Sequence, residues 1–216
     1  MKKLQLIVLI ILCIFLCSCG FKAPVNAPVK ENEAKSIDYS SLSNDLFSYD
    51  ILLDGKKYTL PVNFSELEAD GWTIDPESAK HGLMAHFYVI NIKITKNQEE
   101  VTVNFVNNSS ESRDLNKCDV GLIRTYGGFG AGKVSVVLPK GISFNATEDE
   151  ITSAYGKPSK IESLDDNFDT YTYIDPNVID ETYQNIELIM SKKDHMLSSI
   201  QAENMYSKEK LNQSNK

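Results

Sequence analysis

The sequence predicts an α+β fold of two tandem modules, each a short helix plus an antiparallel β-meander. A well-defined helix signal lies in residues 138–158, and a weaker one of the same kind lies in residues 60–72. Each begins with a Leu-Pro pair and is followed by segments in which apolar and polar residues alternate. Such alternation is typical of strands with one buried and one solvated face. We therefore expect modules over residues 46–130 and 131–206.

The first module is expected to open with a β-hairpin. The dipeptide Asp54-Gly55 favours a tight turn between two antiparallel strands. A short helix is predicted over residues 64–69, and residues 75–82 are expected to form a polar loop. The strands predicted for this module cover residues 47–53, 56–60, 86–94, 100–106 and 118–126.

The helix of the second module has signals at both of its ends. Thr147 and Glu150 have the spacing of a capping box, in which each side chain satisfies a backbone N–H of the first turn. Ile151 begins a short apolar stripe. Gly156 suits the left-handed conformation that ends many helices, and Pro158 prevents continuation. The strands predicted after this helix cover residues 169–174, 186–190 and 196–202.

The N-terminus has the pattern of a secretory leader. Lys2 and Lys3 precede an apolar run over residues 4–16, which is short for a membrane-spanning helix. The run ends in Leu16-Cys17-Ser18-Cys19, which resembles the lipobox of bacterial lipoproteins. The resemblance implies a signal peptide over residues 1–18 and a lipid (a diacylglycerol, with or without a further acyl chain such as palmitate) on Cys19. An uncleaved signal anchor and an ordinary secretory signal are the alternatives.

A lipid on Cys19 would place the domain on the extracytoplasmic side of the cell membrane. Residues 19–45 contain prolines, serines, asparagines and mixed charges, and are expected to form a flexible tether. Residues 207–216 are expected to form a disordered tail. Cys118 would be the remaining free thiol of the mature chain, so that no intramolecular disulfide could form. We expect Cys118 to be a small buried residue; a reactive thiol is the alternative.

The charge of the chain argues against nucleic acid as a partner. The formal net charge is −8, and loss of Lys2 and Lys3 with the leader makes it −10. Binding to phosphates requires clustered lysine and arginine, and the sequence contains no basic stripe. Beyond the lipid anchor, the same charge disfavours electrostatic docking on anionic lipid.

Motifs for catalysis and cofactors are weak in this sequence. Gly127 and Gly132-Lys133 have the spacing of a phosphate loop, but Val134 replaces the required serine or threonine. The segment that follows is predicted to be a strand, so we expect a linker and no nucleotide. The three histidines, His81, His86 and His195, have no zinc-site spacing. We therefore expect no metal, no cofactor and no enzymatic activity.

Tyrosines on the predicted strands are the candidate interaction surface. Tyr171 and Tyr173 are two residues apart and share one face of their strand. Tyr88 and Tyr126 lie at the start and end of two other predicted strands. Exposed tyrosines on a broad sheet are suited to protein recognition, because each offers a large contact area at small entropic cost. The alternative is that Tyr171 and Tyr173 cover the core beneath a helix.

The predicted architecture resembles that of the beta-lactamase inhibitor protein, which also consists of two helix-plus-meander units. The helix motif over residues 142–158 is similar to one in small outer-membrane-assembly lipoproteins of that fold group and in surface lipoproteins of Gram-positive bacteria. The resemblance covers most of residues 46–204, and its motifs are caps, turns and core positions. It implies a lipid-anchored, non-enzymatic module that binds another envelope protein. A ligand- or cell-wall-component-binding lipoprotein is the alternative, and an enzyme is the third possibility.

Overall fold

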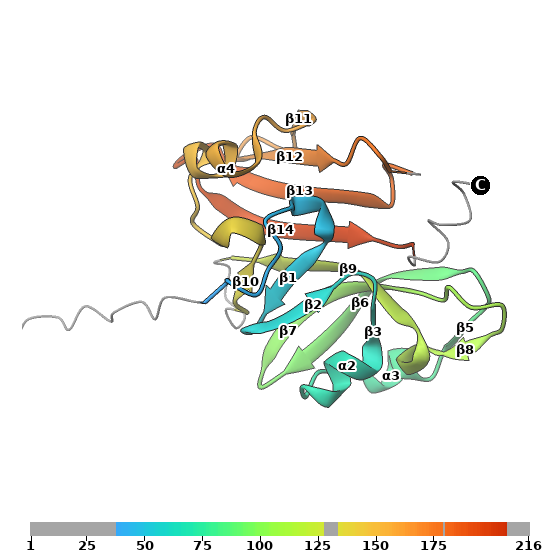
Figure 1. Cartoon of the computed structure of the whole chain (residues 1–216). Coiled ribbons are helices and arrows are strands. Elements are labelled where there is room, and N and C mark those ends of the chain that lie inside the picture. The colour runs from blue at the N-terminus through green and yellow to red at the C-terminus, as the bar shows by residue number, and fades with distance from the viewer. Residues whose placement is uncertain (1–37, 128–133, 179, 207–216) are drawn as a thin grey trace, which may run out of the picture. The chain divides into compact units, whose positions relative to one another are not determined.

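The computed structural model describes residues 38–127, 134–178 and 180–206 (Figure 1). The predicted signal peptide, the lipidation site Cys19, most of the tether, the glycine-rich segment 128–133 and the C-terminal tail lie outside these residues. Within the described part of the chain, no helix is long and apolar enough to cross a membrane.

The protein is an α+β fold in which antiparallel sheet predominates over a few short helices. The helices are α2 (Phe64–Ala69), α3 (Pro76–Ala79) and α4 (Glu148–Tyr155). The strands up to the centre of the chain are β1 (Asp50–Leu53), β2 (Lys56–Thr59), β3 (Val62–Asn63), β4 (Thr73–Ile74), β5 (Gly82–Leu83), β6 (Tyr88–Lys96), β7 (Glu99–Val106), β8 (Arg113–Asp114) and β9 (Asp119–Tyr126). The later strands are β10 (Val136–Val137), β11 (Lys160–Ser163), β12 (Phe168–Ile174), β13 (Gln184–Ser191) and β14 (Leu197–Asn204).

A nine-stranded sheet forms the main layer of the fold. Its order is β11-β12-β13-β14-β9-β7-β6-β4, and β3 also pairs with β9. The antiparallel pair β14–β9 joins strands from the two halves of the sequence, with Gln201 opposite Arg124. The large sheet is therefore continuous across both predicted modules.

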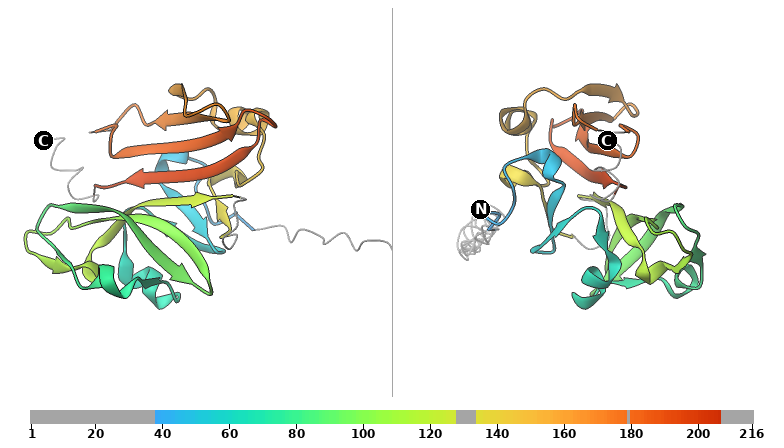
Figure 2. Two further views of the ribbon diagram at one scale, coloured as in Figure 1. Left: turned by 180° about the vertical axis from the view of Figure 1, so that it is seen from behind. Right: turned by 45° about the vertical axis from the view of Figure 1, so that its right-hand side comes forward.

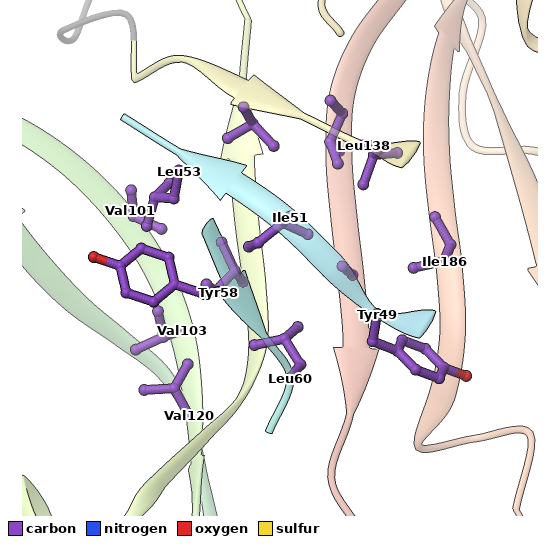
Figure 3. Close-up of a cluster of buried hydrophobic side chains, with 14 of the residues drawn as sticks. Tyr49, Ile51, Leu53, Tyr58, Leu60, Val101, Val103, Val120, Leu138 and Ile186 are labelled. Atoms are coloured by element: carbon purple, nitrogen blue, oxygen red, sulfur yellow. The ribbon is translucent and has the colours of Figure 1, made fainter. Parts of the chain in front are cut away.

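A three-stranded sheet, β10-β1-β2, packs against the large sheet. The predicted hairpin is confirmed: β1 and β2 flank Asp54-Gly55, both of which have positive φ as a tight hairpin turn requires. Figure 3 shows Ile51 and Leu60 pointing toward Val103 of the large sheet. All three side chains are at most 2% exposed, so the main hydrophobic core lies between the two sheets.

The helices cover the edges of this core. The capping box of α4 is confirmed, because the Thr147 backbone N–H donates to Glu150 Oε2 at 2.8 Å and the Glu150 N–H donates to Thr147 Oγ1 at 3.3 Å. Ile151 then buries the apolar side of α4 in the core. In α2, Phe64 packs against Phe105 of β7 with 5.4 Å between the ring centroids. Helices α2 and α4 thus lie on the same side of the large sheet as the core.

The two-residue strands β3, β4, β5 and β8 were not predicted, and Leu46–Ser48, partly within the predicted strand 47–53, form a 3-10 turn. Two further elements also differ from the predictions. Residues 75–82, predicted to be loop, contain the single-turn helix α3, in which Asp75 caps the Ser78 N–H and Pro76 occupies the first helical position. Strand β11, which was not predicted, pairs antiparallel with β12 at the edge of the large sheet. Its side chains are all exposed, so it lacks the alternation by which a half-buried strand is recognised.

Candidate functional site

Strand register divides the large sheet into a core face and a polar face. Directly paired residues of antiparallel strands point to the same side of a sheet. Gln201 of β14 pairs with both Arg124 of β9 and Glu187 of β13, and Arg124 also pairs with Thr102 of β7. These four side chains therefore form one row on the side opposite to the hydrophobic core. We call this side the polar face; the residues from its central strands are Thr102, Asn104, Val106, Asp119, Leu122, Arg124, Tyr126, Asn185, Glu187, Ile189, Ser199, Gln201 and Glu203.

The sheet bends around this face. Tyr88 of β6 and Tyr183, next to β13, are separated in the sheet by β7, β9 and β14. Their hydroxyl oxygens are nevertheless 3.3 Å apart and their ring centroids 5.6 Å apart. Figure 2 shows strands β12–β14 inclined to strands β6–β9. The polar face is thus the inner side of a curved sheet.

The curvature buries polar side chains that an ordinary solvated sheet face would expose. Glu203 is 7% exposed and Asn185, its partner across the β13–β14 ladder, is 5% exposed. Gln201 and Asn104 are buried to a similar degree. Buried polar groups are costly to a fold unless they find partners. Their concentration on the side away from the core marks this face as the candidate functional site.

Arg124 is held near the centre of the polar face by neutral amides. Its Nε donates to Gln201 Oε1 at 2.7 Å, and its Nη1 lies 3.5 Å from Asn91 Oδ1. Among the described residues no salt bridge joins Arg124 to Glu187 or Glu203. The guanidinium is therefore oriented by hydrogen bonds while its charge is only partly compensated.

The two glutamates of this face hold protons more tightly than ordinary carboxylates. Burial, followed by the negative charge of Glu187, raises the pKa of Glu203 to about 7, although Arg124 and a hydrogen bond from Asn104 oppose the shift. Burial also raises the pKa of Glu187. Perturbed carboxylates of this kind are concentrated at functional sites, because a fold gains nothing from burying them without compensation.

Tyrosines lie at one end of the polar face. Tyr183 contacts Tyr88 on one side and Tyr206 on the other, with 6.4 Å between the Tyr183 and Tyr206 ring centroids. The hydrogen bond to Tyr88 raises the pKa of Tyr183 to about 12. A cavity of about 170 Å³ lies among these rings, and His86 and Asn108 also line it.

Tyr126 lies at the other end of the same face. It pairs with Ser199 of β14 and is 56% exposed, and Tyr88 is 47% exposed. Tyr88 pairs with Val106 of β7, which is four residues from Thr102, the partner of Arg124, and Tyr126 lies two residues beyond Arg124. A bulge in β9 between Val120 and Leu122 keeps the two ends of the strand in register with one face. The two exposed tyrosines are therefore six rows apart, about 20 Å along the sheet at the usual rise of a strand. The structure thus places these two predicted residues on one face.

The other two predicted tyrosines belong to the core, so the prediction of an exposed surface at Tyr171 and Tyr173 is wrong. They lie on the core face of β12 beneath α4 and are 7% and 3% exposed. The Tyr171 hydroxyl donates to Glu148 Oε1 at 2.8 Å, and the Tyr173 hydroxyl donates to the Gly156 carbonyl at 3.2 Å. The alternative that they cover the core is correct.

The remaining candidates do not join this site. His81, His86 and His195 are exposed, and only His86 lies near the tyrosine cavity. Cys118 is buried in the core, where desolvation raises the pKa of its thiol to about 11, so the alternative of a reactive thiol is not supported. Within the described ranges no group of three or more histidine, cysteine or acidic side chains could hold a metal ion.

Sequence reasoning missed Glu187, Arg124 and Glu203. Each follows an apolar residue in its strand, and Glu187 is also followed by one, which is the signal that an outward-facing position gives. An outward-facing charge is usually a solvated one, so this pattern alone does not indicate a site. Searches against protein-family models, curated proteins and solved structures find no match to this chain.

Proposed function

We propose that this protein is a lipid-anchored lipoprotein on the extracytoplasmic side of the cell membrane, and that it acts as a non-enzymatic binding module for another envelope protein. The polar face of the large sheet is its binding surface. The observation that carries this proposal is the row of near-buried polar side chains around Arg124 and Glu203, with an exposed tyrosine at each end.

The residue types on this face are those that dominate protein interfaces. Tyrosine and arginine are the side chains most often found at energetic hot spots, because they offer large contact areas and directed hydrogen bonds. Arg124 is already oriented by Gln201, and Tyr88 by Tyr183, so little entropy remains to be lost on binding. A pre-formed surface of this kind supports a binding role.

The tandem organisation predicted from the sequence is part of this proposal. Modules over residues 46–130 and 131–206 each contribute one strand of the central pair, β9 and β14. Arg124 comes from the first module, and Glu187, Gln201 and Glu203 come from the second. The binding face would then exist only when both modules are joined.

A ligand-binding lipoprotein is the alternative function. The observation that favours it is the cavity of about 170 Å³ among Tyr88, Tyr183 and Tyr206. This volume is smaller than that of typical pockets for small organic ligands, which are about 300 Å³ or more. The broad polar face therefore supports a macromolecular partner better than the cavity supports a small ligand.

Replacing Cys19 with alanine is expected to release the protein from the membrane into the medium. The proposed acyl chains would contribute about 0.8 kcal/mol for each buried CH₂ group, and the variant would lose all of this. Fractionation of cells into membrane and medium measures the effect, with Cys13→Ala as the matched control inside the leader. Firm membrane retention of the Cys19→Ala protein would exclude the lipid anchor and favour an uncleaved signal anchor.

Replacing Tyr88 and Tyr126 together with alanine is expected to weaken partner capture by about tenfold or more while the domain stays folded. Both side chains are exposed, so their removal costs contact area at the interface but little core packing. The measurement is in-cell crosslinking of the full chain followed by quantification of the captured envelope protein. The control is Ile161→Ala with Leu164→Ala, which removes two exposed apolar side chains at the β11 edge. Equal capture by both variants would refute the proposed face.

A further inference from the structure

We propose that the polar face receives a cationic side chain, a lysine or an arginine in an extended segment of the protein partner, at an acceptor cluster formed by Glu187, Glu203 and Asn185. This inference rests on the proposed function, because it specifies the chemistry of the partner at the proposed binding face. It goes further in naming the charge that the partner must supply and the atoms that accept it.

The three members of the acceptor cluster are neighbours on β13 and β14. Asn185 lies directly opposite Glu203, and Glu187 lies opposite Gln201, two residues before Glu203 on β14. Glu187 and Glu203 are therefore diagonal neighbours on one face, roughly 7 Å apart. A single ammonium or guanidinium group can lie between two carboxylates at that separation.

Asn185 shows that this cluster lacks a donor. Its side-chain nitrogen donates to the backbone oxygens of Glu181 at 2.9 Å and Thr182 at 3.4 Å, which fixes the orientation of the amide. Its Oδ1 is buried and has no hydrogen-bond partner. A buried acceptor without a donor destabilises the fold, and an N–H group of the partner that displaces the side chains covering Oδ1 would recover that energy.

The charges of the face also favour a cation. Arg124 is the one cationic side chain that bonds to residues of this central region in the described part of the chain, and its hydrogen bonds go to amide oxygens of Gln201 and Asn91. Lys160, in the row of Glu187 across β12, also lowers the pKa of Glu187, but its ammonium group pairs with Glu162 at 2.8 Å. The two carboxylates of the cluster are therefore only partly compensated. Burial is the main cause of the raised pKa values of both glutamates, and Arg124 opposes both shifts without cancelling them. A neutral ligand could donate a hydrogen bond to Asn185 but would not compensate the negative charges of Glu187 and Glu203. An anion would be repelled by both glutamates.

The dimensions of the face favour a polypeptide over a free amine. The two exposed tyrosines are about 20 Å apart along the strands, a span that an extended segment of about six residues would cover. The acceptor cluster lies between them, on the rows of Gln201 and Glu203. A basic residue in such a segment would contact the cluster while apolar residues on either side contact Tyr88 and Tyr126.

The test is an NMR titration of the full chain in detergent micelles with capped alanine pentapeptides that carry lysine, arginine, leucine or glutamate at the centre. We expect the lysine and arginine peptides to shift the backbone amides of Asn185, Glu187 and Glu203 saturably. The double variant Glu187→Gln/Glu203→Gln should lose affinity by about tenfold or more, because both acceptor carboxylates lose their charge. The matched control Glu66→Gln/Glu68→Gln removes the same charge from exposed positions of α2 and should leave affinity unchanged.

Several outcomes would overturn the inference. Leucine or glutamate peptides that shift the same amides equally would do so, as would the absence of any shift with lysine and arginine peptides at millimolar concentration. A response to calcium chloride stronger than that to the peptides would assign the cluster to a metal ion. An equal loss of affinity in the control variant would mean that the basic peptides bind through the net negative charge of the chain and not through the acceptor cluster.

The partner-capture experiment distinguishes this inference from the proposed function. Loss of capture in the Tyr88 and Tyr126 variant but full capture by Glu187→Gln/Glu203→Gln would leave the binding face valid and refute the cationic contact. Specific shifts with basic peptides, together with no effect of the tyrosine replacements on capture, would support the acceptor cluster and refute the proposed function.

Discussion

Replacing Tyr171 and Tyr173 together with alanine is expected to abolish the cooperative unfolding transition of the domain. Both side chains are buried on the core face of β12, and each hydroxyl donates a hydrogen bond to α4 or to the residue that ends it. Tyr173 also packs edge-to-face against Tyr155, with 5.8 Å between the ring centroids. Removal of one large buried aromatic side chain costs about 3–5 kcal/mol. Two such losses approach the whole stability of a typical domain, about 5–15 kcal/mol.

Circular dichroism during thermal unfolding measures this effect. Tyr173→Phe keeps the ring and removes only the hydroxyl, so it should lower the melting temperature moderately and retain the transition. Tyr88→Ala/Tyr126→Ala is the matched control, because it removes two tyrosines from the opposite face of the same sheet. A sharp transition near the wild-type temperature in the Tyr171→Ala/Tyr173→Ala protein would mean that α4 does not cover β12.

Local sequence signals were sufficient to predict the start of α4 and the turn between β1 and β2. Thr147 and Glu150 set the start of α4, and Asp54-Gly55 set the β1–β2 turn, because the interactions involved lie within four residues. The helix α3 was missed although Asp75 and Pro76 give a start signal, because one turn is too short to show an apolar stripe. Strand β11 was missed because it is held in an extended conformation by pairing with β12, and residues 160–163 contain no local signal of that pairing.

The candidate site depends on long-range pairing that the sequence does not encode locally. Alternation placed Tyr171 and Tyr173 on one face of their strand but could not say which face meets the core. That choice is made by α4, which packs on β12 and accepts a hydrogen bond at Glu148. Likewise Arg124 and Gln201 meet through the β14–β9 ladder, seventy-seven residues apart in the chain. The curvature that buries Glu203 follows from the same pairing.

Replacing Glu203 with glutamine is expected to stabilise the protein at pH 8 and to have little effect near pH 4. The pKa of Glu203 is raised from 4.5 in an unfolded chain to about 7 in the fold, first by burial and then by Glu187. The native state therefore binds a proton more tightly than the unfolded state does. The free energy of unfolding contributed by this group falls as pH rises from about 4.5 to about 7. The resulting penalty at pH 8 is about 3 kcal/mol, and glutamine does not incur it.

Urea denaturation of the two proteins at pH 4, 6 and 8 tests this prediction, since the titrating groups that do not interact with Glu203 are shared and cancel in the difference. The charged or titratable neighbours are Glu187 of β13, Arg124 of β9 and Tyr49, which precedes β1. Glu162→Gln on the exposed edge strand β11 is the control and should show no pH-dependent gain. A gain of Glu203→Gln that is equal at all three pH values would show that Glu203 ionises normally. A gain confined to high pH would mean that the fold bears a cost to keep this carboxylate on the polar face, a cost that a cationic partner would relieve.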